Sequence, residues 1–197
     1  MRRFAIIGSL APSSGNISLE DLPGHGRIDV ICRNIGSCLL LSHGIRNDTE
    51  VVVHLLGGPG KPRRIRFTGS KITGLRADER SIAGRIRKIL SEPLPPSGVW
   101  KEVSSGVSHS GGPLAVTLQE WRRLGVHLYT LDADGLPLDS IHETPSDSGY
   151  ILGDHRPLDD SNFVGPESRI SLGKTWLLGS ACITIIHHWL DNQPGSP

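Results

Sequence analysis

Short strand-like runs alternate with helix-like segments along most of this chain. Residues 4–8 form a fully apolar run, which is typical of a strand buried on both faces. Between residues 27 and 42, apolar residues recur every three or four positions, which predicts a helix packed against a sheet. Strands joined by helical crossovers run in parallel. The pattern therefore predicts an α/β fold with a mostly parallel sheet flanked by helices.

The same periodicities outline the remaining elements. Further strands are predicted at 50–56, 64–67, 127–131, 150–152 and 169–172, and further helices at 77–90, 114–124 and 175–190. Residues 132–135, with the sequence Asp-Ala-Asp-Gly, are predicted to form a turn. Residues 91–112 contain three prolines and end in a Ser/Gly-rich stretch, so they are predicted to form a surface connection. The 197 residues fit a single domain.

Charge and cysteine content narrow the class of protein. The formal net charge is only +1, so any nucleic-acid partner must be held by a local basic patch. Cys32, Cys38 and Cys182 are an odd set without CxxC spacing, which argues against a disulfide framework and a structural zinc site. No apolar stretch is long enough to span a membrane without interruption. A soluble protein of the reducing cytoplasm is expected.

Glycines follow three predicted strands in the C-terminal third of the chain. One strand leads into Gly135 through two aspartates, the next into Gly153, and the last into Gly173. Ligands of open α/β sheets collect outside the carboxyl ends of the strands, and glycine allows the backbone to approach them closely. A single glycine after a strand more often marks an ordinary turn, and it is the three together that favour a ligand site. The chain has neither G-x-G-x-x-G after its first strand nor a P-loop motif, which argues against a standard dinucleotide or P-loop site.

Several segments together resemble one known family. They are residues 2–8 (RRFAIIG), 26–33 (GRIDVICR), 42–46 (SHGIR), 152–155 (LGDH), 171–173 (SLG) and 182–191 (CITIIHHWLD). In this order they closely resemble the archaeal-type tRNA (pseudouridine(54)-N1)-methyltransferases, which belong to the SPOUT class of S-adenosylmethionine-dependent RNA methyltransferases. The resemblance runs from the first strand to the last helix, so it is more specific than any single motif.

This resemblance implies a C-terminal trefoil knot, a homodimer, S-adenosylmethionine as cofactor and tRNA as substrate. The implied product is N1-methylpseudouridine at position 54 of the T-loop. The implied cofactor contacts are Leu131, Gly153, Ser171, Leu172, Gly173, Leu177, Leu178 and Cys182. Two features depart from the family pattern: Pro157 stands where a glycine is expected, and residues 104–112 match poorly.

N1 methylation of pseudouridine requires removal of a weakly acidic proton and stabilisation of the charge that develops on the base. Asp29 and Arg33 are four residues apart on one predicted helix face, and Arg46 follows closely. We expect Arg33 and Arg46 to hold phosphate or a base carbonyl, with Asp29 orienting a proton acceptor. The alternative for Asp29 and Arg33 is a surface ion pair.

A local basic patch is predicted around residues 61–71, where Arg63, Arg64 and Arg66 are proposed to contact RNA, with Lys61 and Lys71 beside them. Strand alternation places Arg64 and Arg66 on one side, and the alternative is a charged edge strand that guards against aggregation.

Cys182, among isoleucines, is predicted to be an inert thiol that lines an adenosine pocket. Adjacent His187 and His188 point about 100° apart on a helix, which argues against metal binding. Two other functions stay open from the residues alone: methylation of rRNA pseudouridine, and a non-catalytic RNA-binding or assembly role.

Overall fold

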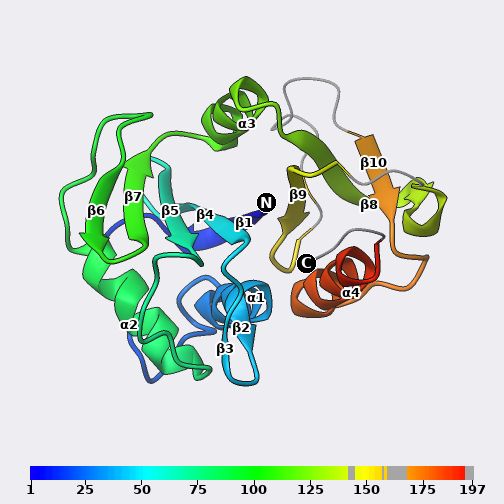
Figure 1. Cartoon of the computed structure of the whole chain (residues 1–197). Helices are drawn as coiled ribbons and strands as arrows, with labels where there is room; N and C mark the ends of the chain where they lie inside the picture. The colour runs from blue at the N-terminus through cyan, green and yellow to red at the C-terminus, as the bar shows by residue number, and fades with distance from the viewer. Residues whose placement is uncertain (142–144, 157, 159–167, 194–197) are drawn as a thin grey trace.

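The computed structural model describes residues 1–141, 145–156, 158 and 168–193. An eight-stranded sheet runs through it in the order β10-β8-β9-β1-β4-β5-β7-β6 (Figure 1). The first five of these strands are parallel neighbours: β10 (Ser168–Ser171), β8 (His127–Pro137), β9 (Ser148–Gly153), β1 (Arg2–Pro12) and β4 (Thr49–Gly57). The antiparallel strands β5 (Arg63–Thr68), β7 (Val107–Gly111) and β6 (Lys101–Ser104) extend the sheet. The predicted mostly parallel central sheet is confirmed.

Helices cover the two faces of the sheet unequally (Figure 1). One face carries α1 (Ile28–Leu39), α2 (Glu79–Leu90) and α4 (Gly179–Asp191), and the other carries α3 (Leu114–Arg123). A hairpin of β2 (Leu40–Leu41) and β3 (Gly44–Ile45) follows α1, and a 3-10 turn, η1 (Leu138–Ser140), follows β8. No helix in these ranges is both long and apolar enough to cross a membrane.

Strand β1 lies at the centre of the sheet and supplies both of its cores. Phe4 and Ile6 belong to the larger apolar core on the side of α1, α2 and α4, whereas Ala5 and Ile7 belong to the smaller core beneath α3. Successive side chains of a strand point to opposite faces, so a continuous apolar run is what a doubly covered strand requires. The predicted strand at residues 4–8 is thus confirmed, in an element that is longer at both ends.

Two predictions about loops are wrong. Residues 91–112 contain the hairpin of β6 and β7, which pairs with β5. Residues 132–135 are not a tight turn, because β8 continues through them to Pro137. The pairing of β8 with β10, however, is irregular. Arg169 of β10 pairs with Thr130, whereas the next residue, Ile170, pairs with Leu136. The segment between Thr130 and Leu136 therefore bulges out of the ladder near the carboxyl end of β8.

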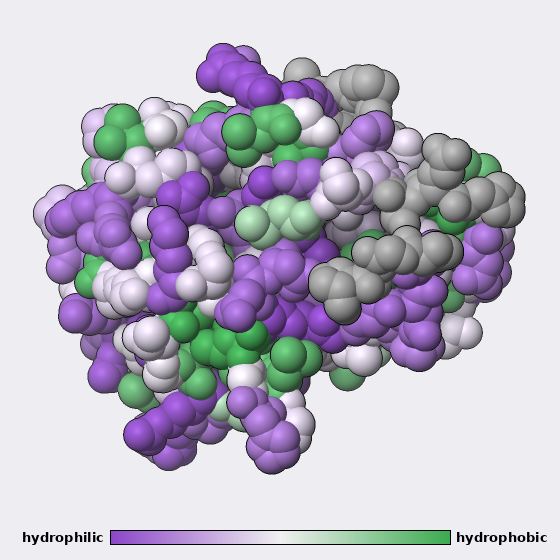
Figure 2. All heavy atoms as spheres, in the orientation of Figure 1, coloured by the Kyte–Doolittle hydropathy of each residue, from purple (hydrophilic) through white to green (hydrophobic). Residues whose placement is uncertain are grey.

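Most of the surface in the space-filling view is hydrophilic, and an apolar patch lies over α1 and the β2–β3 hairpin (Figure 2). Leu41 in this hairpin is 48% exposed, and Ile185 on α4 is 38% exposed. Exposed apolar area of this kind is typical of a surface that another molecule covers.

Candidate functional site

The three glycine-bearing strand ends lie side by side. Strands β10, β8 and β9 are adjacent and parallel, so their carboxyl ends leave the sheet at one edge. The Ser171 hydroxyl donates to the Ala133 carbonyl at 3.1 Å, and the Lys174 ammonium donates to the same carbonyl at 3.0 Å and to Asp134 at 2.8 Å. The end of β10 is therefore bonded to the bulge of β8. We call the carboxyl ends of β8, β9 and β10, together with the first turn of α4, the strand-end site.

Two of the three glycines of this site, Gly153 and Gly173, differ in what surrounds them. Gly173 has a φ of 112°, a conformation that favours glycine, and a Cβ added there would meet nothing within 4 Å. A Cβ added at Gly153 would lie 2.4 Å from the Arg156 carbonyl oxygen. Gly153 thus allows the chain to turn back on itself, whereas Gly173 borders open space.

Large apolar side chains are exposed around the same elements. Trp176 is 79% exposed, Leu178 68%, Leu136 64% and Leu177 40%. Leu131 and Leu172 are partly buried against the larger core. Exposed apolar side chains beside backbone groups are suited to a flat heterocycle. All the residues predicted to contact the cofactor belong to these strand ends, to the segment before α4, or to α4 itself.

Cys182 lies one turn into α4 and is half-buried. Burial raises the pKa of its thiol, so the group stays protonated at neutral pH. This agrees with the prediction of an inert thiol and not with a nucleophile.

Asp154 fixes the loop that leaves β9, although the sequence analysis gave it no role. Its Oδ2 accepts a hydrogen bond from the Ser9 backbone N–H at 3.1 Å, and its Oδ1 accepts from the backbone N–H groups of His155 at 2.6 Å and Arg156 at 3.2 Å. One carboxylate thus ties the end of β9 to the end of β1. The only signal in the sequence was its place directly after a strand-end glycine.

Asp29, at the start of α1, is 5% exposed and lies between two arginines. Arg27 donates to both of its oxygens at 2.9 and 3.0 Å, and Arg33 donates at 2.7 Å. These hydrogen bonds, that of Arg27 first, lower the pKa of Asp29 to about 2. Asp29 is therefore a permanent anion that positions the two guanidinium groups, and Arg33 reaches on to Glu79 at 2.9 Å. The ion pair considered above is present as part of a half-buried network of Arg27, Asp29, Arg33 and Glu79, which we call the α1 network.

Arg27 is a residue that the sequence analysis missed. Its φ of 64° makes it the one non-glycine residue with positive φ in the described ranges, and it occupies the N-cap position of α1. Hydrogen bonding to Asp29 raises the pKa of Arg27, and the charge of Asp154 adds to the rise. Arg27 therefore interacts with Asp29 in α1 and also with the charge of Asp154, which follows β9 in the strand-end site. Strained backbone of this kind collects at functional sites, but no sequence pattern reveals it.

Arg46 lies at the opposite edge of the sheet. Its guanidinium donates to both oxygens of Asp191 at 3.1 and 2.8 Å, and Arg2, at the start of β1, contacts the same carboxylate. Gly153 pairs with Ile7, five residues further along β1. At about 3.3 Å per residue, this places the two ends about 17 Å apart. Arg46 is thus remote from the strand-end glycines, but it lines one cavity together with Arg33, so its action beside Asp29 and Arg33 stays a prediction.

A surface cavity of about 660 Å³ lies between α1, α4 and the start of α2. Its lining includes both Arg33 and Arg46, with their partners Glu79 and Asp191. None of the strand-end glycines lines it. The cavity nevertheless adjoins the strand-end site at Ser180, in the first turn of α4, and extends from there to Arg46.

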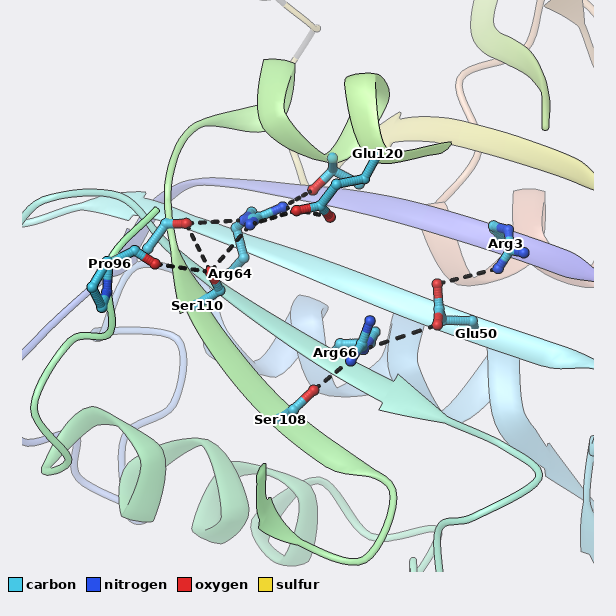
Figure 3. A network of polar contacts seen from close by, with 10 residues as sticks. Arg3, Glu50, Arg64, Arg66, Pro96, Ser108, Ser110 and Glu120 are labelled. Atoms are coloured by element: carbon cyan, nitrogen blue, oxygen red, sulfur yellow. Dashed lines mark hydrogen bonds and ion pairs between the residues drawn. The ribbon is translucent and has the colours of Figure 1, made fainter. Parts of the chain in front are cut away.

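The predicted RNA patch on β5 is largely buried, which corrects the roles given to Arg63 and Arg64. Arg64 is 0% exposed, and Arg63 is 2% exposed. Arg64 donates to Glu120 at 3.0 and 3.1 Å and to Ser110 at 3.1 Å (Figure 3). Arg63 donates to the carbonyls of Ile89 and Glu92. These guanidinium groups have protein partners and no surface to offer to phosphate.

Arg66 is the part of this patch that reaches solvent, with a side chain 32% exposed. It shares one face of the strand with Arg64, as the alternation predicted, while Ile65 and Phe67 enter the larger core. Both guanidinium groups lie over the Trp100 ring, at 4.6 Å for Arg64 and 4.3 Å for Arg66. Arg66 also donates to Ser108 at 3.2 Å (Figure 3).

His187 is buried and bonded on both sides. Its Nε2 lies 3.0 Å from the Cys38 carbonyl, which makes Nε2 the donor, and its Nδ1 accepts from Arg2 at 3.2 Å. Burial lowers its pKa to about 4. The part of the chain that the structure describes contains no group of three or more His, Cys, Asp or Glu residues that could hold a metal ion.

Comparisons with known proteins agree with this geometry. The model of a family described as "Putative SAM-dependent RNA methyltransferase" matches residues 1–194. A tRNA (pseudouridine(54)-N(1))-methyltransferase of Methanococcus vannielii is 37% identical over 198 residues, covering 97% of this chain and 98% of the relative. The protein of the same name from Thermococcus kodakarensis is also 37% identical, covering 98% of this chain and all of the relative.

A solved structure shares the fold at much lower identity. The crystal structure of Archaeoglobus fulgidus Nep1 bound to S-adenosylhomocysteine has a TM-score of 0.67 and 15% identity, covering 96% of this chain and 97% of that one. This likeness concerns the fold alone. Because the family model matches residues 1–194, the chain belongs to the family of SAM-dependent RNA methyltransferases.

Proposed function

We propose that this protein transfers a methyl group from S-adenosylmethionine to N1 of pseudouridine 54 in the T-loop of tRNA. The observation that carries the proposal is the strand-end site, where three parallel strands end beside exposed apolar side chains in a chain of this family. The relatives that are 37% identical over nearly their whole length bear the name of this activity.

The residues present fit S-adenosylmethionine. Gly173 borders open space, and the exposed Leu177 and Leu178 supply an apolar wall for the adenosine. The residues proposed to hold the cofactor are Leu131, Gly153, Ser171, Leu172, Gly173, Leu177, Leu178 and Cys182. The bound cofactor supplies an electrophilic methyl group, so positioning the acceptor base in line with it provides much of the rate.

The α1 network is proposed to hold the RNA. Arg27 and Arg33 keep their charge at every physiological pH and are fixed by Asp29, so they are suited to a phosphate or to a base carbonyl on which negative charge develops. Asp29, with a pKa of about 2, is too weak a base to take the N1 proton. Its proposed role is to orient the groups around the acceptor.

A trefoil knot and a homodimer are part of the proposal. The knot is supported by strand order: β10 follows β9 in the chain but pairs with β8, so β8 lies between these two consecutive strands in the sheet. The connection runs through residues 157–167, of which the structure describes only Leu158, and the unusual Pro157 lies outside the described residues. The dimer is supported by the apolar patch over α1 and β2–β3 and by exposed Ile185. A cytoplasmic location is consistent with the three free cysteines.

Methylation of tRNA transcripts with and without pseudouridine at position 54 tests the function. Methyl transfer to the pseudouridine transcript alone is expected, because uridine has no N1 hydrogen. Equal labelling of the uridine transcript would contradict the N1 mechanism. Preferential labelling of rRNA fragments would favour an rRNA methyltransferase. Calorimetric titration with S-adenosylhomocysteine separates both from a non-catalytic RNA-binding factor, which would show no site.

A further inference from the structure

A second cavity, of about 450 Å³, lies between α2 and the loop that follows β1. Gly15 and Asn16 line it from the loop, and Gly84, Arg87 and Lys88 line it from α2. We propose that this cavity binds a phosphodiester of the RNA substrate, away from the methylated base. The proposal rests on the proposed function for the identity of the RNA.

The cavity lies at the same edge of the sheet as the strand-end site. Strand β1 ends at Pro12, opposite Gly57 of β4, and runs parallel to β9. The C-terminal end of α2 returns to this edge, because Arg63, at the start of β5, donates to the Ile89 carbonyl. One RNA molecule can therefore contact both sites from the same side of the protein.

Two positively charged side chains, Arg87 and Lys88, line this cavity, and no ion pair neutralises them in the described ranges. Arg87 and Lys88 are exposed, and neither has a carboxylate within ion-pair distance in the described ranges. By contrast, Arg80 on the same helix pairs with Glu20, and Lys101 pairs with Glu92. Basic residues in the last turn of a helix also interact favourably with the helix dipole, but this stabilises the helix by less than about 1 kcal/mol. Arg63 and Arg64 are buried and cannot reach a ligand, whereas Arg87 and Lys88 are exposed and available to phosphate.

The loops around the cavity leave it open to solvent. Gly15 has a φ of 89°, so its backbone takes a turn that side chains disfavour. A Cβ added at Gly60 would lie 2.6 Å from the hydroxyls of both Ser13 and Ser14, so the glycine-rich loop after β4 packs tightly on this loop. That contact brings the exposed Lys61 to the same corner.

Gly84 is the most informative residue of the cavity. It stands inside a helix, where glycine is less favourable than alanine by about 1 kcal/mol. Packing does not require it, because an added Cβ would meet nothing within 4 Å. The absence of a side chain keeps the floor of the cavity open. A ligand that enters the cavity accounts for this glycine, and internal packing does not.

The test measures binding of tRNA as a function of salt concentration, with the full-length protein. The double variant Arg87→Gln, Lys88→Gln is expected to bind about tenfold more weakly and to lower the slope of log K against log salt by about 0.9 for each lost phosphate contact. The matched control is Arg123→Gln, an exposed cation in the last turn of α3, which is expected to change neither quantity. An unchanged slope in the double variant would overturn the proposal.

Gly84→Leu tests the cavity without removing charge. The variant is expected to be at least as stable as the wild type in thermal unfolding, yet to bind tRNA more weakly. Full tRNA affinity in this variant would contradict the proposal. Inorganic phosphate is expected to displace tRNA from the wild type more than chloride of equal ionic strength does, because it competes for the same cavity, and equal displacement by the two salts would contradict the proposal. Because these assays require no methyl transfer, their outcome is independent of whether the proposed reaction is correct.

Discussion

Arg64 and Glu120 form a bidentate ion pair beneath α3, with nitrogen–oxygen distances of 3.0 and 3.1 Å and no exposed surface on the arginine. Arg64→Ala would leave Glu120, Thr117 and Ser110 without this partner. Breaking a buried pair from one side costs about 3–5 kcal/mol. We therefore expect a large loss in the free energy of unfolding, measured by urea titration. The salt dependence of RNA binding by the folded fraction is expected to stay as in the wild type, and a shallower slope would restore Arg64 to the RNA surface.

Asp29→Asn tests the α1 network. The carboxylate has a pKa of about 2 in the folded protein, against about 3.9 for a free aspartate, which corresponds to about 2–3 kcal/mol of stability above pH 4. Because the folded pKa is the lower one, this stability is lost as the pH falls from about 4 to 2. We expect the variant to lose about 2–3 kcal/mol at pH 7 and to differ little from the wild type near pH 2. A constant difference across this window would contradict the assignment.

Gly153→Val tests the turn after β9. The added side chain would collide with the Arg156 carbonyl and displace the loop that Asp154 holds. We expect S-adenosylhomocysteine to bind at least about tenfold more weakly, which corresponds to about 1.4 kcal/mol in calorimetry. Gly84→Val, on α2 and outside the strand-end site, is the control, since a Cβ there meets nothing within 4 Å. Normal cofactor affinity in the Gly153 variant would remove this turn from the site.

His187 predicts a dependence of stability on pH. Burial lowers its pKa to about 4, so the folded protein keeps it neutral while the unfolded chain protonates it near pH 6.5. The free energy of unfolding is therefore expected to fall by up to about 1.4 kcal/mol per pH unit between pH 6.5 and 4. His187→Gln, which does not titrate, should flatten this part of the profile. An identical profile in the variant would show that His187 does not contribute.

Periodicity was sufficient to predict the parallel strands and the helices, because burial on one or two faces leaves a direct trace in the order of apolar residues. It failed for β7, whose Val-Ser-His-Ser-Gly sequence contains little that favours a strand. This strand is held by its ladder to β5 and by hydroxyls that accept from Arg64 and Arg66. Such tertiary bonds have no local signature.

The candidate site was predicted in part for the same reason. Strand-end glycines could be recognised because parallel strands deliver their ends to one edge. The position of Arg46 could not be predicted from the sequence. It pairs with Asp191 at the end of α4, and only the packing of α4 reveals this pairing. Alternation correctly assigned Arg64 to a face of β5, but it gave no information about α3 and Trp100, which cover that face.

The central position of β1 has a consequence for synthesis on the ribosome. Its early partner, β4, emerges soon after it, but β9, on its other side, is made only when most of the chain has been translated. Until then one edge of a highly apolar strand has no neighbour, which is the condition in which nascent chains aggregate. A chaperone that shields residues 2–12 during translation would be expected to increase the yield of native protein.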